Sequence, residues 1–285
     1  MIRVRTLEPG DETAVGAFLS RHADASMFLR SNLLAAGLAY DGRTFECTWA
    51  GAFENGDLVG VAAHAWNGIV LVQAPRALAD IVRHAVTTSG RAVGGVLAEW
   101  AQVLATRSAL GLDARAARFV TRDDLFALDL SRLVVPEPLA QGRVRVRIAG
   151  DADLEHVVRW RSAYRVELMG HPADDPDLDA SSRAETAPLL AQGDGFLLEA
   201  NHAPVAFSVF NARLPDCVQV GSVYTPPALR GRGYARAVVA GSLLAARAAG
   251  VARSILFTGE DNERARRAYV SLGYEIVGDY GNCFF

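Results

Sequence analysis

The stretch "VYTPPALRGRGYA" (residues 223–235) carries the first clear signal of fold and chemistry in this chain. It starts with a β-prone triplet, passes through two prolines and a loop with two glycines, and enters an alanine-rich helix. N–H groups at a helix start are unpaired and lie at the positive end of the helix dipole, so they can bind an anion. Gly231 and Gly233 remove obstructing Cβ atoms, while Arg230, Arg232 and Arg236 add positive charge. The alternative is a plain turn with solvated arginines.

Two well-known phosphate motifs do not describe this loop. A Walker loop needs a lysine before Ser or Thr, and the 29 basic residues of this chain are all arginine. A dinucleotide fingerprint needs a third glycine where Arg236 stands, and it belongs to an opening βαβ unit. The pattern that fits is R-x-x-G-x-G/A, with Arg230, Gly233 and Ala235 between a strand and a helix. We therefore favour the phosphate cradle over the plain turn.

A second pattern follows in "DNERARRAYVSLGYEIVG" (residues 261–278). It reads N-x-x-A-x-x-x-Y-x-x-x-G-Y, through Asn262, Ala265, Tyr269, Gly273 and Tyr274. Together, loop and helix resemble the GNAT superfamily of acyl-CoA-dependent N-acyltransferases over about residues 143–285.

The resemblance implies a binding site for acetyl-CoA. Backbone groups of the strand end would bond the pantetheine arm and polarise the thioester, and N–H groups of the loop would hold the pyrophosphate. The implied cofactor-binding residues are Val223, Tyr224, Thr225, Arg230, Gly231, Arg232, Gly233, Tyr234, Ala235 and Asn262. Tyr269 would stand beside the sulfur and protonate the departing thiolate, although a tyrosine before Gly273 can also simply pack the last helix.

A general base is also needed to deprotonate the attacking amine. Glu167 and His171 lie in "WRSAYRVELMGHPADDPDLDA", which corresponds to the acceptor side of this fold. Glu167 is our candidate, against the alternative of a solvated surface carboxylate. The acidic residues that follow are expected in an exposed loop or as helix caps; facing the pocket, they would favour a cationic acceptor. They are Asp174, Asp175, Asp177 and Asp179.

Two segments of the chain share the same order of predicted elements. Residues 2–20 and 144–162 share an alternating strand, a break carrying Gly-Asp, and an amphipathic helix capped by an acidic residue. We expect a domain over 1–135, a linker over 136–143 and a catalytic domain over 144–285. In the first copy, "QAPR" (73–76) replaces the glycine loop, so this copy is expected to be degenerate.

The expected fold is α/β (α+β), with two tandem GNAT-like domains, each a mixed, mostly antiparallel sheet flanked by helices. In the second half, the sequence predicts strands over 195–200, 203–212, 217–224, 253–258, 274–280 and 282–285, and helices over 235–250 and 262–272. In the first half it predicts strands over 43–53, 57–66 and 68–74, and helices over about 76–88 and 95–109.

Composition sets limits on function. The net charge of −3 argues against a nucleic-acid footprint, and no apolar run is long enough to span a membrane. A charged N-terminus lacks the apolar core of a signal peptide, so we expect a cytoplasmic protein whose three scattered cysteines are ordinary apolar residues, with no metal site. The resemblance to the GNAT superfamily implies transfer of an acetyl group from acetyl-CoA to a primary amine on a small molecule or peptide. The alternative is a non-catalytic acyl-CoA sensor.

Overall fold

A computed structural model describes residues 1–285, which divide into two compact units. The N-terminal unit contains residues 1–125 and 278–285, and the C-terminal unit contains residues 126–277. These bounds differ from the sequence-based ones, because the end of the chain returns to the N-terminal unit. Gly281–Phe284 pairs there with Gly95–Ala98. The expected linker contains a short helix, α5 (Glu137–Ala140).

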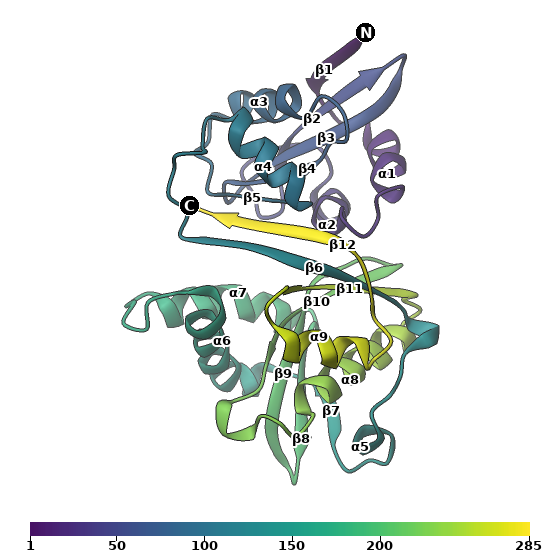
Figure 1. Ribbon diagram of the computed structural model, residues 1–285, viewed down its shortest axis with the longest axis vertical. Coiled ribbons are helices and arrows are strands. Elements are labelled where there is room, and N and C mark those ends of the chain that lie inside the picture. Colours follow the sequence, from purple (N-terminus) through teal and green to yellow (C-terminus); the bar gives the residue numbers. More distant parts are fainter. The chain divides into compact units, whose positions relative to one another are not determined.

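The N-terminal unit is a mixed sheet with helices (Figure 1). Its strands lie in the order β1-β2-β3-β4-β5, followed by the end of β12. All neighbours are antiparallel except β4 and β5. The elements are β1 (Ile2–Thr6), α1 (Glu12–Ser20), α2 (Met27–Ala36), β2 (Cys47–Glu54), β3 (Asp57–Ala65), β4 (Ile69–Gln73), α3 (Leu78–Ser89), β5 (Gly95–Ala98), α4 (Trp100–Ala109) and the first part of β6 (Phe119–Asp129).

The C-terminal unit repeats this arrangement, with strand order β7-β8-β9-β10-β11 and then the end of β6. Here β10 and β11 form the parallel pair. The elements are β7 (Arg145–Ile148), α6 (Leu154–Met169), α7 (Leu178–Ala191), β8 (Gly195–Ala200), β9 (Ala203–Arg213), β10 (Cys217–Tyr224), α8 (Tyr234–Ala248), β11 (Arg253–Gly259), α9 (Glu263–Val270) and the start of β12 (Glu275–Phe284).

The internal repeat predicted from the sequence recurs in detail. Arg5 forms a two-pronged ion pair with Asp11, with N···O distances of 2.6 and 2.7 Å. Arg147 forms the same pair with Asp153, at 2.6 and 2.9 Å. In both copies the arginine lies on the first strand and the aspartate stands at the N-cap of the first long helix. Each unit therefore fixes its opening strand to its opening helix in the same way.

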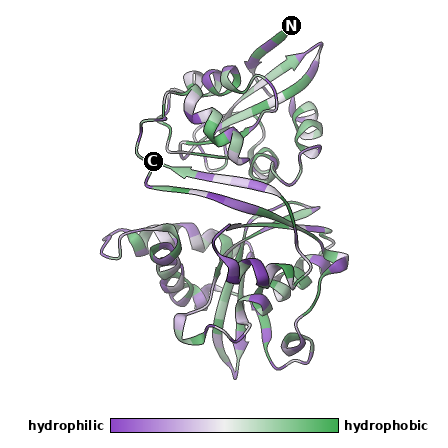
Figure 2. Cartoon of the chain, in the orientation of Figure 1, coloured by the Kyte–Doolittle hydropathy of each residue, from purple (hydrophilic) through white to green (hydrophobic).

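Two apolar cores cover the two faces of the C-terminal sheet. On one face, α8 and α9 pack on the strands through residues such as Val238, Leu243 and Tyr269. On the other face, α6 and α7 pack through Val157 and Leu190. Figure 2 shows α9 as largely hydrophilic, so only a narrow side of this helix joins the core. The unit is thus a sheet between two helical layers, with β10 and β11 near its middle.

Most of the strands and helices expected in the second half are present. Elsewhere in the chain, one predicted helix and the bounds of some predicted strands differ from the structure. The predicted helix over 95–109 is split into β5 and α4, because the short apolar run "GVLA" is a buried strand. The strand expected from Arg43 begins at Cys47, and the two final strands are one, β12. The three cysteines are free and buried, as predicted.

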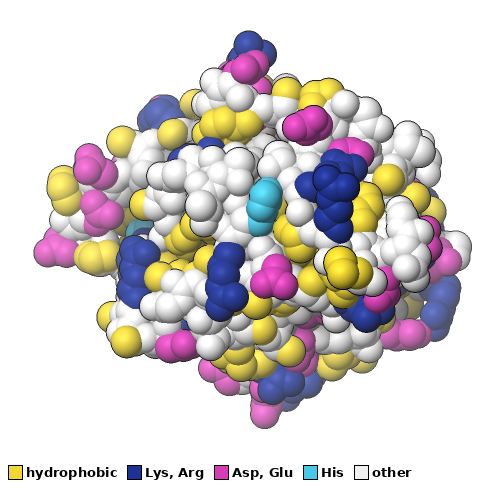
Figure 3. Space-filling model, turned by 90° about the horizontal axis from the view of Figure 1, so that it is seen from above, with side chains coloured by type: hydrophobic (Ala, Val, Ile, Leu, Met, Phe, Trp, Pro, Cys, Tyr) yellow, Lys and Arg dark blue, Asp and Glu magenta, His cyan; other side chains and the backbone are white.

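The surface carries both signs of charge. On the face in Figure 3, arginine and acidic side chains are interspersed with apolar ones. No helix is both long and apolar enough to cross a membrane.

Candidate active site

The corner between β10 and α8 has the backbone of an anion cradle. A single turn of 3-10 helix (Pro227–Leu229) follows β10, and the chain then passes through Gly231 (φ +78°) and Gly233 (φ +77°). L side chains rarely adopt such angles, which explains both glycines. None of the backbone N–H groups from 231 to 236 donates a hydrogen bond within the chain. A Cβ at Gly231 would have no atom within 4 Å, so the loop faces open space.

The strand before this corner leaves its parallel neighbour. β10 pairs with β11 only from Cys217 to Val220. Its register with β9 then shifts between Gly221 and Tyr224, and Ser222 within this bulge has φ +49°. The backbone of Val223 therefore has no ladder partner on the β11 side. An extended arm of a ligand can take the place of the missing strand there.

Arg230 is held at the base of the loop by three contacts. Its Nη1 and Nη2 donate to the two carboxylate oxygens of Glu167 at 2.6 and 2.7 Å, and its Nε donates to the carbonyl of Thr225 at 2.8 Å. Its Cζ also lies 5.7 Å from the centre of the Tyr224 ring. The side chain thus points back to α6 and β10. Arg232, by contrast, is exposed.

This ion pair makes Glu167 a poor general base. Both carboxylate oxygens accept from Arg230, and these hydrogen bonds lower the pKa of Glu167. A base that works near neutral pH needs a raised pKa and a free oxygen. The other candidate, His171, lies 3.4 Å from Arg165 through Nε2. Two of the acidic residues have hydrogen-bond donors nearby: Asp175 accepts from the N–H of Asp177, and Asp179 of α7 accepts from the hydroxyl of Ser162 on α6.

Tyr269 is buried on α9, with its ring against Phe126 and Tyr274 at centroid distances of 6.1 Å each. Burial raises the pKa of Tyr269 far above its ordinary value, and Tyr164 raises it further. The phenol therefore keeps its proton near neutral pH, so it has a proton to donate and does not act as a base. Tyr164 comes from α6, so side chains from both faces of the sheet approach here.

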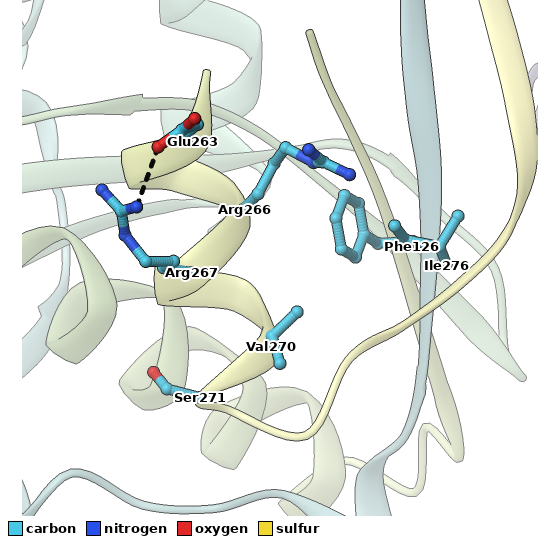
Figure 4. A pocket seen from close by; sticks show the side chains of 7 residues that line it. All are labelled: Phe126, Glu263, Arg266, Arg267, Val270, Ser271 and Ile276. Atoms are coloured by element: carbon cyan, nitrogen blue, oxygen red, sulfur yellow. Dashed lines mark hydrogen bonds and ion pairs between the residues drawn. The ribbon is translucent and has the colours of Figure 1, made fainter. Parts of the chain in front are cut away.

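The start of α9 adds polar groups. The side-chain oxygen of Asn262 caps the helix by accepting from the N–H of Ala265 at 3.2 Å, which leaves both of its amide N–H groups for a ligand. A pocket of about 450 Å³ lies along α9 (Figure 4). Figure 4 shows Val270, Phe126 and Ile276 lining it, with Arg266 extending toward Phe126. Ser271, at one end, lies 3.4 Å from Arg236 of α8.

Three residues on the α6 side of β10 were not predicted from the sequence as part of the site. Trp160 lies 6.3 Å from Tyr224, ring centre to ring centre, and with Tyr164 and Glu167 it forms one face of α6. The third, Asn211, is exposed on β9 and covers Gly221: a Cβ there would lie 1.9 Å from its Nδ2. Because Asn211 sits at a register shift of β9, only the structure reveals this placement. The spacing of Trp160, Tyr164 and Glu167 was a readable signal.

The corresponding corner of the N-terminal unit is closed. β4 ends at Gln73, and the N–H of Ala74 donates to the side chain of Gln102 at 2.7 Å. Pro75 has no N–H, and Asp80 stands in the first turn of α3. A phosphate would meet fewer N–H groups and an extra negative charge there.

Comparisons with known proteins agree on one fold. The model of the acetyltransferase (GNAT) family matches residues 157–274. Similar solved structures include a GNAT-family acetyltransferase from Colwellia psychrerythraea (17% identity, TM-score 0.55, covering 99% of both chains). They also include a Drosophila protein (9%, 0.65, covering 99% of this chain and 98% of that one). A tandem GNAT protein from the clavulanic acid biosynthesis pathway is a third (14%, 0.56, covering 100% and 98%). No curated protein sequence matches. The two units are thus GNAT-like folds in tandem.

Proposed function

We propose that this protein transfers the acetyl group of acetyl-CoA to a primary amine, since residues 157–274 match the model of the acetyltransferase (GNAT) family. The observation that carries the proposal is the open corner after β10. Unbonded N–H groups from 231 to 236 lie in the loop before α8 and in its first turn, and the strand leading to them no longer pairs with β11. The first feature suits a pyrophosphate and the second an extended arm.

Each part of the corner has its own task in this proposal. The N–H groups of Gly231 to Ala235 hold the pyrophosphate, and backbone groups of Val223 to Thr225 hold the pantetheine arm. Asn262 approaches this arm with its amide N–H groups. Acetyl-CoA supplies an activated thioester, which the amine attacks directly, without a covalent intermediate on the enzyme. Tyr269 donates a proton to the departing sulfur, since its phenol stays protonated.

The acceptor approaches from the α6 side of the sheet. Asn211 lies there over Gly221, next to the bulge of β10, and its carboxamide forms no hydrogen bond within the chain. Its free donors and acceptor suit the positioning of an amine. Trp160 and Tyr224 add aromatic faces, which attract a cationic amine. We propose Asn211 as an acceptor-binding residue.

The N-terminal unit is proposed to be a degenerate domain without a cofactor site, since its corner is closed by Gln102 and Pro75. The second candidate function is an acyl-CoA sensor, which keeps the open corner and performs no chemistry. The observation that favours it is the engagement of Glu167 by Arg230, which removes the candidate base.

One experiment separates the two functions. The protein is mixed with acetyl-CoA and a panel of small amines and peptides, and released thiol is followed over the acceptor-free rate. Turnover with any amine supports the acetyltransferase. Binding of acetyl-CoA by calorimetry, without turnover on the whole panel, supports the sensor. Absence of binding contradicts both.

A further inference from the structure

We infer that Glu167 is a positioning residue: it holds Arg230, and through Arg230 it holds the end of β10 in the shape that receives acetyl-CoA. The inference rests on the proposed function and replaces the role of general base for this residue. The ion pair between Glu167 and Arg230 connects α6, on the acceptor side of the sheet, with the cofactor corner.

The geometry fixes Arg230 on several sides. Three of the five N–H groups of its guanidinium are engaged, two by Glu167 and one by the carbonyl of Thr225. Two parallel bonds to one carboxylate set both the distance and the orientation of the side chain, which a single bond does not. The Thr225 carbonyl is the last backbone group of the stretch proposed to bind the pantetheine arm. A change at Glu167 therefore reaches that stretch through one side chain.

The placement of Glu167 is not explained by folding stability. It lies in the last turn of α6, where the negative end of the helix dipole disfavours a carboxylate, and that turn contains no basic residue. Each side chain of the pair is 37% exposed, and exposed ion pairs contribute little to stability. Glu167 is thus in an unfavourable position for the helix, and its partner, Arg230, belongs to the loop proposed to bind the cofactor.

The test compares binding and chemistry in the same variants. Acetyl-CoA affinity is measured by calorimetry, and kcat/KM is measured against pH, for the parent, Glu167→Gln, Arg230→Gln and the double variant. We expect each single change to weaken acetyl-CoA binding about five- to tenfold, the size of the loss of one ordinary hydrogen bond, because the change acts through the position of the strand end. Arg230 also contacts the Thr225 carbonyl and the Tyr224 ring, so the double variant should lose no more than Arg230→Gln alone, because Glu167 then has no side chain left to position. The acidic limb of the pH profile should stay in place.

A matched control lies on the same helix. Glu155 pairs with Arg183 at 2.6 Å, away from the corner, so Glu155→Gln should leave acetyl-CoA affinity unchanged. The inference is overturned if Glu167→Gln binds acetyl-CoA like the parent, and replaced by the base role if kcat falls strongly and the acidic limb disappears. If the parent itself binds no acetyl-CoA, the proposed function is overturned as well. Failure of the inference and failure of the proposed function are therefore distinguishable.

Discussion

The corner between β4 and α3 and the corner between β10 and α8 occupy corresponding places in the two units. Both follow a strand with one parallel neighbour, and both lead into a helix. In the first, β4 pairs regularly with β3 up to Gln73, and the Gln102 side chain binds the N–H of Ala74. In the second, β10 bulges before Tyr224 and the following N–H groups stay free.

Because the two corners share one fold and differ in their free N–H groups, the fold alone does not create a cofactor-binding site. Near β4, the side chains of Gln73, Gln102 and Glu99 bind one another at the end of the strand, with Gln102 and Glu99 in a short hydrogen bond. A ligand arm would have to displace this polar group. Near β10, the ladder with β11 stops at Val220, and two glycines with positive φ follow in the loop. A few residues thus separate a structural corner from a binding corner.

The largest expected effect comes from closing the open corner. Gly233→Asp places a carboxylate and a Cβ beside the free N–H groups, at a residue with φ +77°. The charge alone repels a pyrophosphate, so we expect acetyl-CoA affinity to fall at least about 100-fold, or about 3 kcal/mol. Calorimetry should find one site per parent chain and none in the variant. Two equivalent parental sites would contradict the contrast between the corners.

Gly142→Asp is the control for backbone strain. Gly142 lies in the same unit at φ +69°, and a Cβ there would also stand in open space. Aspartate tolerates left-handed angles at a cost of about 1 kcal/mol. The two variants should therefore melt alike while only one loses binding. Equal losses of affinity would identify general destabilisation as the cause.

Two neighbouring tyrosines should separate chemistry from packing. Tyr269→Phe removes the proposed proton donor and keeps the ring, so kcat should fall about 100-fold, near the low end for general acid catalysis, with an unchanged melting temperature. The hydroxyl of Tyr274 instead shares a buried hydrogen bond of 2.7 Å with Ser254. Tyr274→Phe should cost about 1 to 3 kcal/mol of stability and leave kcat nearly unchanged.

The result for Tyr269 has a second check. An acyl donor with a more acidic leaving thiol needs less protonation, so the loss in Tyr269→Phe should shrink with such donors. A variant that turns over like the parent with acetyl-CoA would make Tyr269 a packing residue. The proton would then come from Tyr164 or from water.

The sequence predicted the corner after β10 well because its signals are local. Glycines that need positive φ, prolines that end a strand, and a capping Asn262 act within a few residues of themselves. Patterns of alternation likewise located β10 at its observed bounds. Local chemistry of this kind can be read without knowing the partners.

The rest depended on contacts between distant segments. Glu167 reads as a free carboxylate until α6 is placed beside Arg230, 63 residues later. Asn211 gains its position only through a register shift between β9 and β10. The return of Gly281–Phe284 to β5 is set by pairing between strands that lie far apart in the sequence. None of these features has a pattern within a short window.

A smaller effect is expected on the acceptor side. Asn211→Ala removes the carboxamide over Gly221 and leaves the corner of Arg230 and Gly231 intact. We expect KM for the amine to rise about tenfold, which corresponds to one lost hydrogen bond, with unchanged acetyl-CoA affinity. Steady-state kinetics with the amine varied, beside calorimetry with acetyl-CoA, measures both. A loss of acetyl-CoA affinity instead would place Asn211 on the cofactor side.

The smallest effect concerns the stability of the N-terminal unit against acid. His64 is fully buried on β3, and its Nδ1 lies 2.6 Å from the hydroxyl of Ser89 at the end of α3. Burial, with help from Arg91, lowers the pKa of His64 below its ordinary 6.5, so the folded unit holds the neutral ring.

As pH falls through about 6.5, the unfolded chain therefore binds a proton that the folded unit resists, and stability falls by up to about 1.4 kcal/mol per pH unit. Urea unfolding at pH 7.5, 6.5 and 5.5 measures the loss, and amide exchange of β3 localises it. His64→Gln keeps a polar group and removes the titration, so its stability should change less over this range. His156 of the C-terminal unit also has a pKa lowered by burial, but it is only half-buried, so a smaller loss is expected there. An equal slope in the His64→Gln variant would assign the acid sensitivity of the N-terminal unit to other titrating groups.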